Sequence, residues 1–160
     1  MEIQAVNVQK PDDVNVIIGQ AHFIKTVEDL YEAIIAAAAG IQFGIAFCEA
    51  SGACKIRVEG NNDALKKVAA DNALAIGAGH SFVVALTQGF PINILNQIKN
   101  LQEVCTIFAA TANPLQVIVA DNGSGRGILG VIDGLKPQGV EGPQDAQWRH
   151  DLLRKIGYKR

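Results

Sequence analysis

The chain has 160 residues, 49% of them hydrophobic and 19% charged, which is typical of one compact domain with an ordinary core. Fourteen Lys and Arg stand against sixteen Asp and Glu, for a net charge of -2, and the basic residues are scattered except for a short terminal cluster. This balance argues against a nucleic-acid-binding protein, which needs a basic face to neutralise phosphates.

Cysteine usage and the N-terminus indicate a soluble, cytoplasmic protein. Cys48, Cys54 and Cys105 are odd in number, lie in apolar strand-like runs and lack CxxC spacing, so we expect free buried thiols rather than disulfides or a zinc site. The N-terminus has no basic stretch followed by an apolar core, and no apolar run reaches the ~18 residues of a membrane span. We therefore expect no membrane partner.

The first part of the chain predicts two strands and a helix. The β-rich runs 1–9 and 14–20 are separated by the turn sequence KPDD, so we expect a hairpin or two adjacent strands. A capping-box-like sequence then begins at Thr26, and apolar residues recur at helical spacing until Gly40 ends the pattern.

The remaining chain alternates between strand and helix signals. Alternation with a period of two predicts a pair of strands, the second with one wet face, and Asn61 or Asn62 can cap the helix that follows. The predicted strands are 41–48, 54–59, 80–86, 104–112, 115–121 and 128–132, and the predicted helices are 62–76, 91–100 and an amphipathic one from Pro143.

These elements predict a single domain over residues 1–160, of mixed α/β (α+β) class, built on a twisted mixed sheet covered by helices. Several of the strands are apolar on both faces. Helices or a neighbouring subunit must therefore cover both sides of the sheet.

Five polar residues follow or precede apolar strands, where loops place side chains into ligand sites: Glu49, His80, Asn113, Asp121 and Arg126. His80 follows the sequence GAG, so the backbone before it can turn tightly and offer N–H groups to an anion. The imidazole is a candidate nucleophile or general base. The alternative is a histidine hydrogen-bonded inside the core.

A glycine-rich loop at 121–127 holds Arg126, a combination suited to clamping an anion, with Gly125 and Gly127 beside the guanidinium. The alternative is a mobile hairpin loop. Residues 125–130 match GxGxxG, but a predicted strand follows where a dinucleotide fingerprint opens a helix. Walker A, HRD, DFG, GxSxG and HExxH sequences are absent, which excludes the standard machinery that each one marks.

Weaker candidates have ordinary structural alternatives. His22 and Lys25 precede the first helix, where a cation could meet an anion, or they are simply surface residues. Phe47 and Phe82 could stack on a base, although aromatic residues at period-two spacing are typical of a core. Turn carboxylates that could hold a metal, but are more typical of residues bonding their own loops, are Asp121 and Asp133.

Several long blocks together resemble one family. The stretches GQAHFIKTVEDLYEA, FGIAFCEASG, AIGAGHSFVV, ATANPLQVIVAD, GRGILGVIDG and LLRKIGYK are similar to those of the adenosine-specific kinases of archaea and bacteria. The resemblance implies a homo-oligomeric α/β protein, with a trimer as the candidate state. It also implies binding of adenosine and AMP in preference to ADP and ATP, and a phosphorylated histidine that matches His80.

By the same block matching, the candidate pocket residues are Glu49, Asn113 and Arg126, joined by Gly79, Gly125, Gly127, Lys25 and Phe47 as candidate ligand contacts. The resulting hypothesis is a phosphotransferase in which His80 accepts a phosphoryl group, Arg126 and the glycine-loop amides stabilise it, and Glu49 orients or deprotonates the adenosine 5′-hydroxyl. Mg²⁺ is a candidate cofactor for such a transfer. The alternatives are a non-catalytic adenosine or AMP sensor and a purely structural oligomer.

Overall fold

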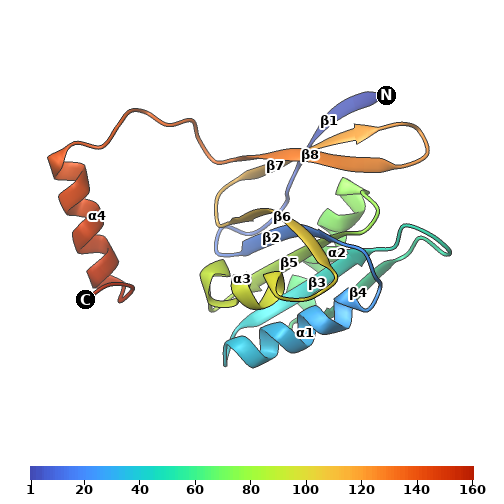
Figure 1. Ribbon diagram of the computed structural model, residues 1–160, viewed down its shortest axis with the longest axis horizontal. Coiled ribbons are helices and arrows are strands. Elements are labelled where there is room, and N and C mark those ends of the chain that lie inside the picture. Colours follow the sequence, from blue (N-terminus) through green and yellow to red (C-terminus); the bar gives the residue numbers. More distant parts are fainter.

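The computed structural model describes residues 1–160 and contains every helix and strand that the sequence predicts (Figure 1). In chain order these are β1 (Glu2–Asn7), β2 (Asn15–Ala21), α1 (Thr26–Ala37), β3 (Gln42–Cys48), β4 (Ile56–Gly60), α2 (Asp63–Ile76), β5 (Ser81–Thr87), α3 (Pro91–Lys99), β6 (Val104–Thr111), β7 (Leu115–Asp121), β8 (Arg126–Asp133) and α4 (Pro143–Lys155). The predicted mixed α+β class is confirmed. None of the four helices has the length and apolar content needed to span a bilayer.

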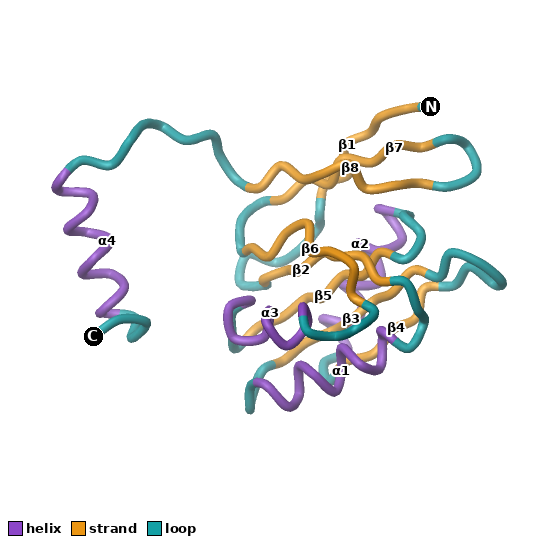
Figure 2. The backbone as a smooth tube through the Cα atoms, in the orientation of Figure 1, coloured by secondary structure: helices purple, strands orange, loops and turns teal.

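The strands form two sheets rather than one (Figure 2). Every strand pairing is antiparallel. The larger sheet has the order β4-β3-β5-β2-β6, and the smaller has the order β1-β7-β8. The expected pairing of the first two strands is wrong, because β1 pairs with β7 while β2 lies between β5 and β6. The turn between β1 and β2 carries the chain from one sheet to the other.

The larger sheet is covered on both faces, as its doubly apolar strands require. On one face, α1 and α3 pack against a core that includes Phe43, Phe47 and Phe82. On the other face, α2 and the smaller sheet share a second core, to which β7 contributes Val117 and Val119. The smaller sheet therefore provides part of the cover that was expected from helices or from a neighbouring subunit.

Helix α2 approaches β3 so closely that only a glycine fits between them. A Cβ atom on Gly44 would lie 2.2 Å from the backbone atoms of Leu65 and Lys66. The two asparagines before α2 have different roles. Asn62 caps the helix by accepting from the N–H of Leu65. Asn61 accepts from the N–H of Phe43 and donates to the carbonyl of Ile41, next to and within β3. Both sequence candidates for the cap are thus used, in different ways.

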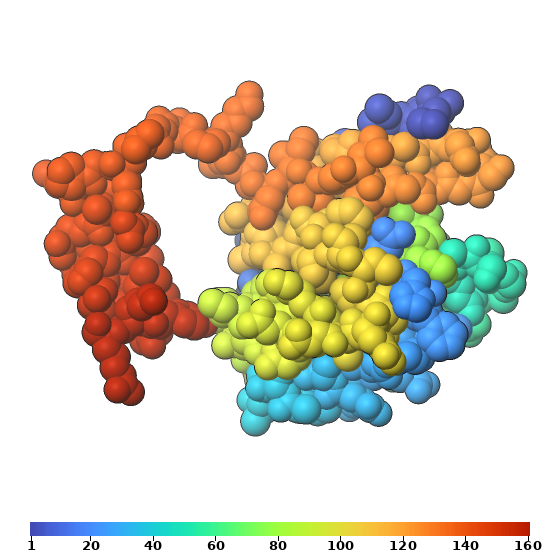
Figure 3. All heavy atoms as spheres, viewed as in Figure 1, coloured from blue at the N-terminus to red at the C-terminus, as the bar shows by residue number.

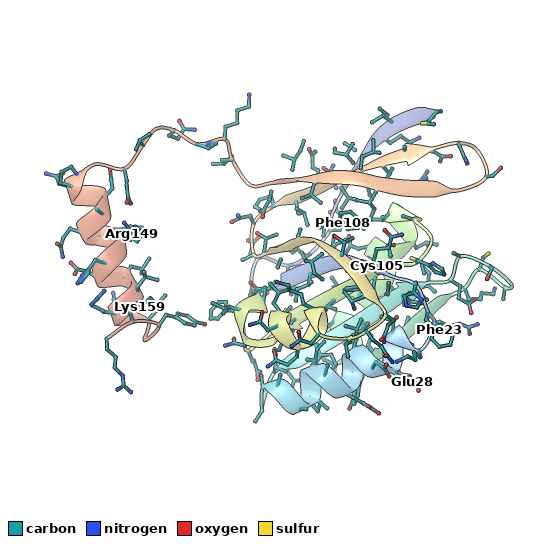
Figure 4. The ribbon with its side chains drawn as sticks, in the orientation of Figure 1. Phe23, Glu28, Cys105, Phe108, Arg149 and Lys159 are labelled. Atoms are coloured by element: carbon teal, nitrogen blue, oxygen red, sulfur yellow. The ribbon has the colours of Figure 1, made fainter.

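Two local expectations are wrong. Lys25, not Thr26, is the N-cap of α1, and the Thr26 hydroxyl instead donates to the Phe23 carbonyl. Of the three cysteines only Cys48 is buried. Cys54 lies in the exposed turn before β4, and Cys105 lies on β6, at an edge of the larger sheet where no further strand covers it (Figure 4).

Helix α4 is present as predicted, but the rest of its own chain does not cover it. Residues 134–142 lead away from β8, and α4 lies beside the body with none of its residues buried (Figures 1 and 3). We call residues 134–160 the C-terminal arm and residues 1–133 the body.

The close approach at Gly44 yields a test of the packing. Gly44→Ala should lower the free energy of unfolding by about 3 kcal/mol, because the new methyl group must push α2 away from β3. Gly130→Ala is the matched control, since a Cβ there meets nothing within 4 Å, and its effect should stay within about 0.5 kcal/mol. Urea denaturation measures both; equal stability of the two variants would contradict the close packing.

Candidate functional site

A cavity of about 380 Å³ lies where the end of β3, the end of α2 and the loop before β8 meet. Its walls include four of the predicted site residues: Glu49, Gly79, Gly125 and Arg126. Cys48 also contributes, and burial raises the pKa of its thiol, which disfavours the reactive thiolate. The cavity thus has polar walls, and the thiol of Cys48 in it is not an activated nucleophile.

Glu49 is held rigidly by two partners across the β3–β4 turn. Its carboxylate accepts the backbone N–H of Lys55 at 2.9 Å and two N–H groups of Arg57 at 2.7 and 3.0 Å. These bonds lower the pKa of Glu49 below its ordinary value. A carboxylate with a lowered pKa is a weaker base, so Glu49 is better suited to accept a hydrogen bond than to remove a proton.

Arg57 was not singled out from the sequence. The sequence could have indicated the pair, because Glu49 and Arg57 lie on either side of a predicted turn and the strands that the turn joins lie opposite one another.

Arg126 joins the small sheet to the end of α2. Its guanidinium donates to Asp121 at 2.8 Å, to the carbonyl of Ala75 at 3.1 Å and to the side chain of Gln4 at 3.4 Å. The ion pair lowers the pKa of Asp121, with help from the N–H of Gly123. A guanidinium has five N–H groups, so two remain for a ligand in the cavity.

The glycine-rich loop does not present its amides to a ligand. The N–H of Gly123 donates to Asp121, and those of Ser124 and Gly125 both donate to the side chain of Asn122. These are Asx turns, in which a side chain replaces the partner that the backbone lacks. Gly127 lies in β8, paired with Ala120, and does not line the cavity. The predicted anion clamp combined loop amides with a guanidinium, and only the guanidinium of Arg126 still has N–H groups to offer.

His80 adopts a backbone conformation that is uncommon for residues other than glycine and that Cys54 and Gln88 also adopt. Its φ is +62°, in the left-handed region, and it is held there because its N–H donates to Cys48 while its carbonyl accepts from Ala21. A Cβ on the preceding Gly79 would lie 2.9 Å from that of Ala50, so the sequence before His80 needs a glycine for space. Outside glycine, such a conformation is strained and concentrates at functional sites.

The imidazole of His80 lies on the face of the sheet opposite to the cavity. It stacks on Phe47, with ring centroids 6.0 Å apart and planes 21° apart. Phe47 and Cys48 are neighbours on β3 and so point to opposite faces, and the cavity is on the Cys48 face. Within one chain, His80 and Arg126 therefore do not share one pocket.

Phe47, the candidate contact for an adenine ring, does not line the cavity. Phe47 is 1% exposed and Phe82 is fully buried, both in the core beneath α1 and α3. Their period-two spacing is that of core residues, which was the alternative. Phe47 supports the imidazole instead.

Lys25 is tied to two carboxylates at the start of α1. Its ammonium pairs with Asp29 and lies 3.3 Å from Glu103, and these contacts raise the pKa of Lys25 and lower that of Asp29. Glu103 is only 1% exposed, and neither of its carboxylate oxygens accepts a hydrogen bond. Phe23 and Glu28 lie beside this cluster, at the start of α1 (Figure 4). The buried Glu103 was missed because it stands in a loop sequence with no apolar pattern.

Asn113 is at the other end of the small sheet. Its side chain donates to Asp133, which also accepts from Thr111, next to the pairing of Leu115 with Asp133. Arg126 pairs with Asp121 at the opposite end of the same two strands. Of the two candidate metal carboxylates, Asp121 bonds within its own loop and Asp133 accepts from Thr111 and Asn113, and no three metal-binding side chains gather anywhere in the chain.

Comparison with known proteins places this geometry in a family. The structure is similar to the crystal structure of the PH1918 protein from Pyrococcus horikoshii OT3, with a TM-score of 0.95 and 45% sequence identity over 99% of this chain and 98% of that chain. No curated protein matches the chain. The family model described as adenosine specific kinase matches residues 6–159. Because that match spans nearly the whole sequence, the resemblance is confirmed, and the chain belongs to the adenosine-specific kinase family.

Proposed function

We propose that the chain binds adenosine and AMP and phosphorylates adenosine through a phosphohistidine at His80. The observation that carries the proposal is the strained backbone of His80, at φ +62°, directly beside a cavity-lining glycine. Family membership supports the substrate class. The half-buried imidazole, supported by Phe47, has the fixed orientation that a nucleophile needs.

The reaction has two balanced steps. First, a neutral imidazole nitrogen of His80 attacks the terminal phosphorus of a phosphoryl donor, so that a P–N bond forms as the P–O bond to the donor breaks. Then the 5′-hydroxyl oxygen of adenosine attacks the same phosphorus, the P–N bond breaks, and the hydroxyl proton leaves to solvent. Glu49 orients a ribose hydroxyl, and Arg126, which shares no pocket with His80 within one chain, offers its two free N–H groups to AMP bound in the cavity rather than to the phosphohistidine.

Mg²⁺ has no evident place in this scheme. Its two candidate ligands, Asp121 and Asp133, lie at opposite ends of the β7–β8 pair, and each already accepts hydrogen bonds from other residues of the chain. No step of the scheme passes through a metal ion.

A non-catalytic adenosine or AMP sensor is the second candidate. The observation that favours it is the placement of His80 and Arg126 on opposite sides of the strand end. A sensor needs only the cavity and its polar walls. A kinase needs the imidazole to reach the bound nucleoside as well.

Labelling of the histidine separates the two candidates. Incubation with a γ-labelled nucleoside triphosphate should produce an acid-labile phosphate on the protein, and a chase with adenosine should move the label to AMP. His80→Asn should abolish labelling, whereas His150→Asn, on the exposed α4, is the matched control and should label normally. Adenosine binding without any labelling would leave the sensor and overturn the kinase.

The cavity itself is tested by binding. Glu49→Gln should raise the dissociation constant for adenosine about tenfold, because a charged hydrogen bond to the ribose is lost. Glu59→Gln, the same exchange on β4 outside the cavity, should leave the constant unchanged. Isothermal titration calorimetry measures both, with circular dichroism as the check of folding. Equal affinities would place the nucleoside elsewhere.

A further inference from the structure

Two of the three cysteines line the candidate cavity, and both come from the β3–β4 hairpin. Cys48 ends β3, and Cys54 lies in the turn that leads to β4 and extends from the edge of the larger sheet (Figure 1). Cys48 pairs with Ile56 in the register of the two strands, so Cys54, two residues before Ile56, is its diagonal neighbour. The two thiols therefore share one wall of the cavity.

The register sets the distance that a bond between the two sulfurs must span. Diagonal neighbours in an antiparallel pair have Cα atoms roughly 7–8 Å apart. A disulfide usually needs Cα atoms within about 6.8 Å of each other. The difference is about 1 Å, and the turn can move by that much because residues 50–55 are all exposed and lie outside the two strands.

The backbone of Cys54 favours such a movement. Its φ is +49°, in the left-handed region, where glycine is the usual residue because it has no Cβ. The N–H of Cys54 donates to the carbonyl of Ser51 at 3.3 Å, which is longer than an ordinary N–H···O bond. A strained residue held by one long hydrogen bond costs little to displace.

The two thiols differ in exposure, which sets the order in which they react. Cys54 is exposed, so an oxidant dissolved in water reaches it first. Cys48 is buried, and burial raises the pKa of its thiol, so it stays reduced until a partner comes close. The hydroxyl of Ser81 lies 3.5 Å from the Cys48 sulfur and donates to it, which stabilises the sulfur as its proton leaves.

We propose that Cys48 and Cys54 form an oxidation site, at which a peroxide produces a disulfide across one wall of the candidate cavity. First, the Cys54 sulfur attacks a peroxide oxygen; an S–O bond forms, the O–O bond breaks, and the peroxide leaves as water or an alcohol. The Cys48 sulfur then attacks the sulfenic acid on Cys54, the S–O bond breaks, and the leaving hydroxide takes the Cys48 proton as water. The two thiols lose one electron pair in total, and the peroxide gains it.

The disulfide acts on the cavity through Glu49. Lys55 follows Cys54 directly, and its N–H holds the Glu49 carboxylate at 2.9 Å. Movement of Cys54 toward Cys48 displaces this donor and narrows the cavity on the side that the hairpin lines. The expected effect on adenosine binding rests on the proposed function, whereas the formation of the disulfide does not.

Mass spectrometry tests the bond directly, because both cysteines fall in one tryptic peptide, residues 26–55. The reduced full-length chain is treated with an equimolar amount of hydrogen peroxide, and the remaining thiols are alkylated. The peptide should escape alkylation and be lighter by a pair of hydrogen atoms, whereas Cys105 should be alkylated. Dithiothreitol should restore alkylation of the peptide.

Substitutions and calorimetry extend the test to the cavity. Cys54→Ser should abolish the bond, and Cys105→Ser, which removes the other exposed thiol, is the matched control and should form it normally. The oxidised chain should bind adenosine about tenfold more weakly than the reduced chain, because the charged hydrogen bond from Glu49 is displaced. Dithiothreitol should restore the affinity, and the affinity of Cys54→Ser should not respond to peroxide.

Three peptide results would overturn the proposal: double alkylation, a sulfinic acid on Cys54 beside a free Cys48, or a bond to a second chain. A disulfide that leaves adenosine affinity unchanged would overturn its effect on the cavity. If the reduced chain binds no adenosine, the proposed function is wrong instead, and the peptide masses still decide whether the oxidation site exists.

Discussion

The fold depends on one constraint: the central strands of the larger sheet are apolar on both faces, so both faces must be covered. Helices α1 and α3 cover one face, and α2 with the small sheet covers the other. The second cover is the tighter one, because α2 lies against the backbone of β3 at Gly44. Helix α2 ends at Gly77, which adopts the left-handed conformation, and the end of α2 forms one wall of the candidate cavity.

The candidate site follows from that arrangement at the edge of the sheet. The antiparallel pairing brings the end of β3 and the beginning of β5 side by side, so Glu49 and His80 lie just beyond the ends of adjacent strands. The imidazole of His80 lies on one face of the larger sheet there, and the guanidinium of Arg126 lies on the other face. The two groups are therefore separated by the strand end. A catalytic cycle at this edge requires the nucleoside to extend around the strand end, and a binding protein does not.

Local sequence patterns predicted the helices and strands well. Four of the predicted site residues lie together around one cavity: Glu49, Gly79, Gly125 and Arg126. What failed depends on long-range contacts or on the direction of a side chain. The turn at KPDD favours a hairpin locally, yet β1 pairs with β7, more than a hundred residues away. Likewise, Asn122 captures the loop amides and α1 covers Phe47; neither follows from spacing along the chain.

The buried Glu103 has a consequence for how this protein can vary. Its carboxylate has no hydrogen-bond donor, and the nearby ammonium of Lys25 compensates its charge. Removal of the lysine alone would leave an uncompensated charge inside the protein, which is strongly destabilising, whereas replacement of both residues by apolar ones is often tolerated. Lys25 and Glu103 are therefore expected to evolve as a coupled pair. Loss of activity on changing only one of them would report on folding before it reports on chemistry.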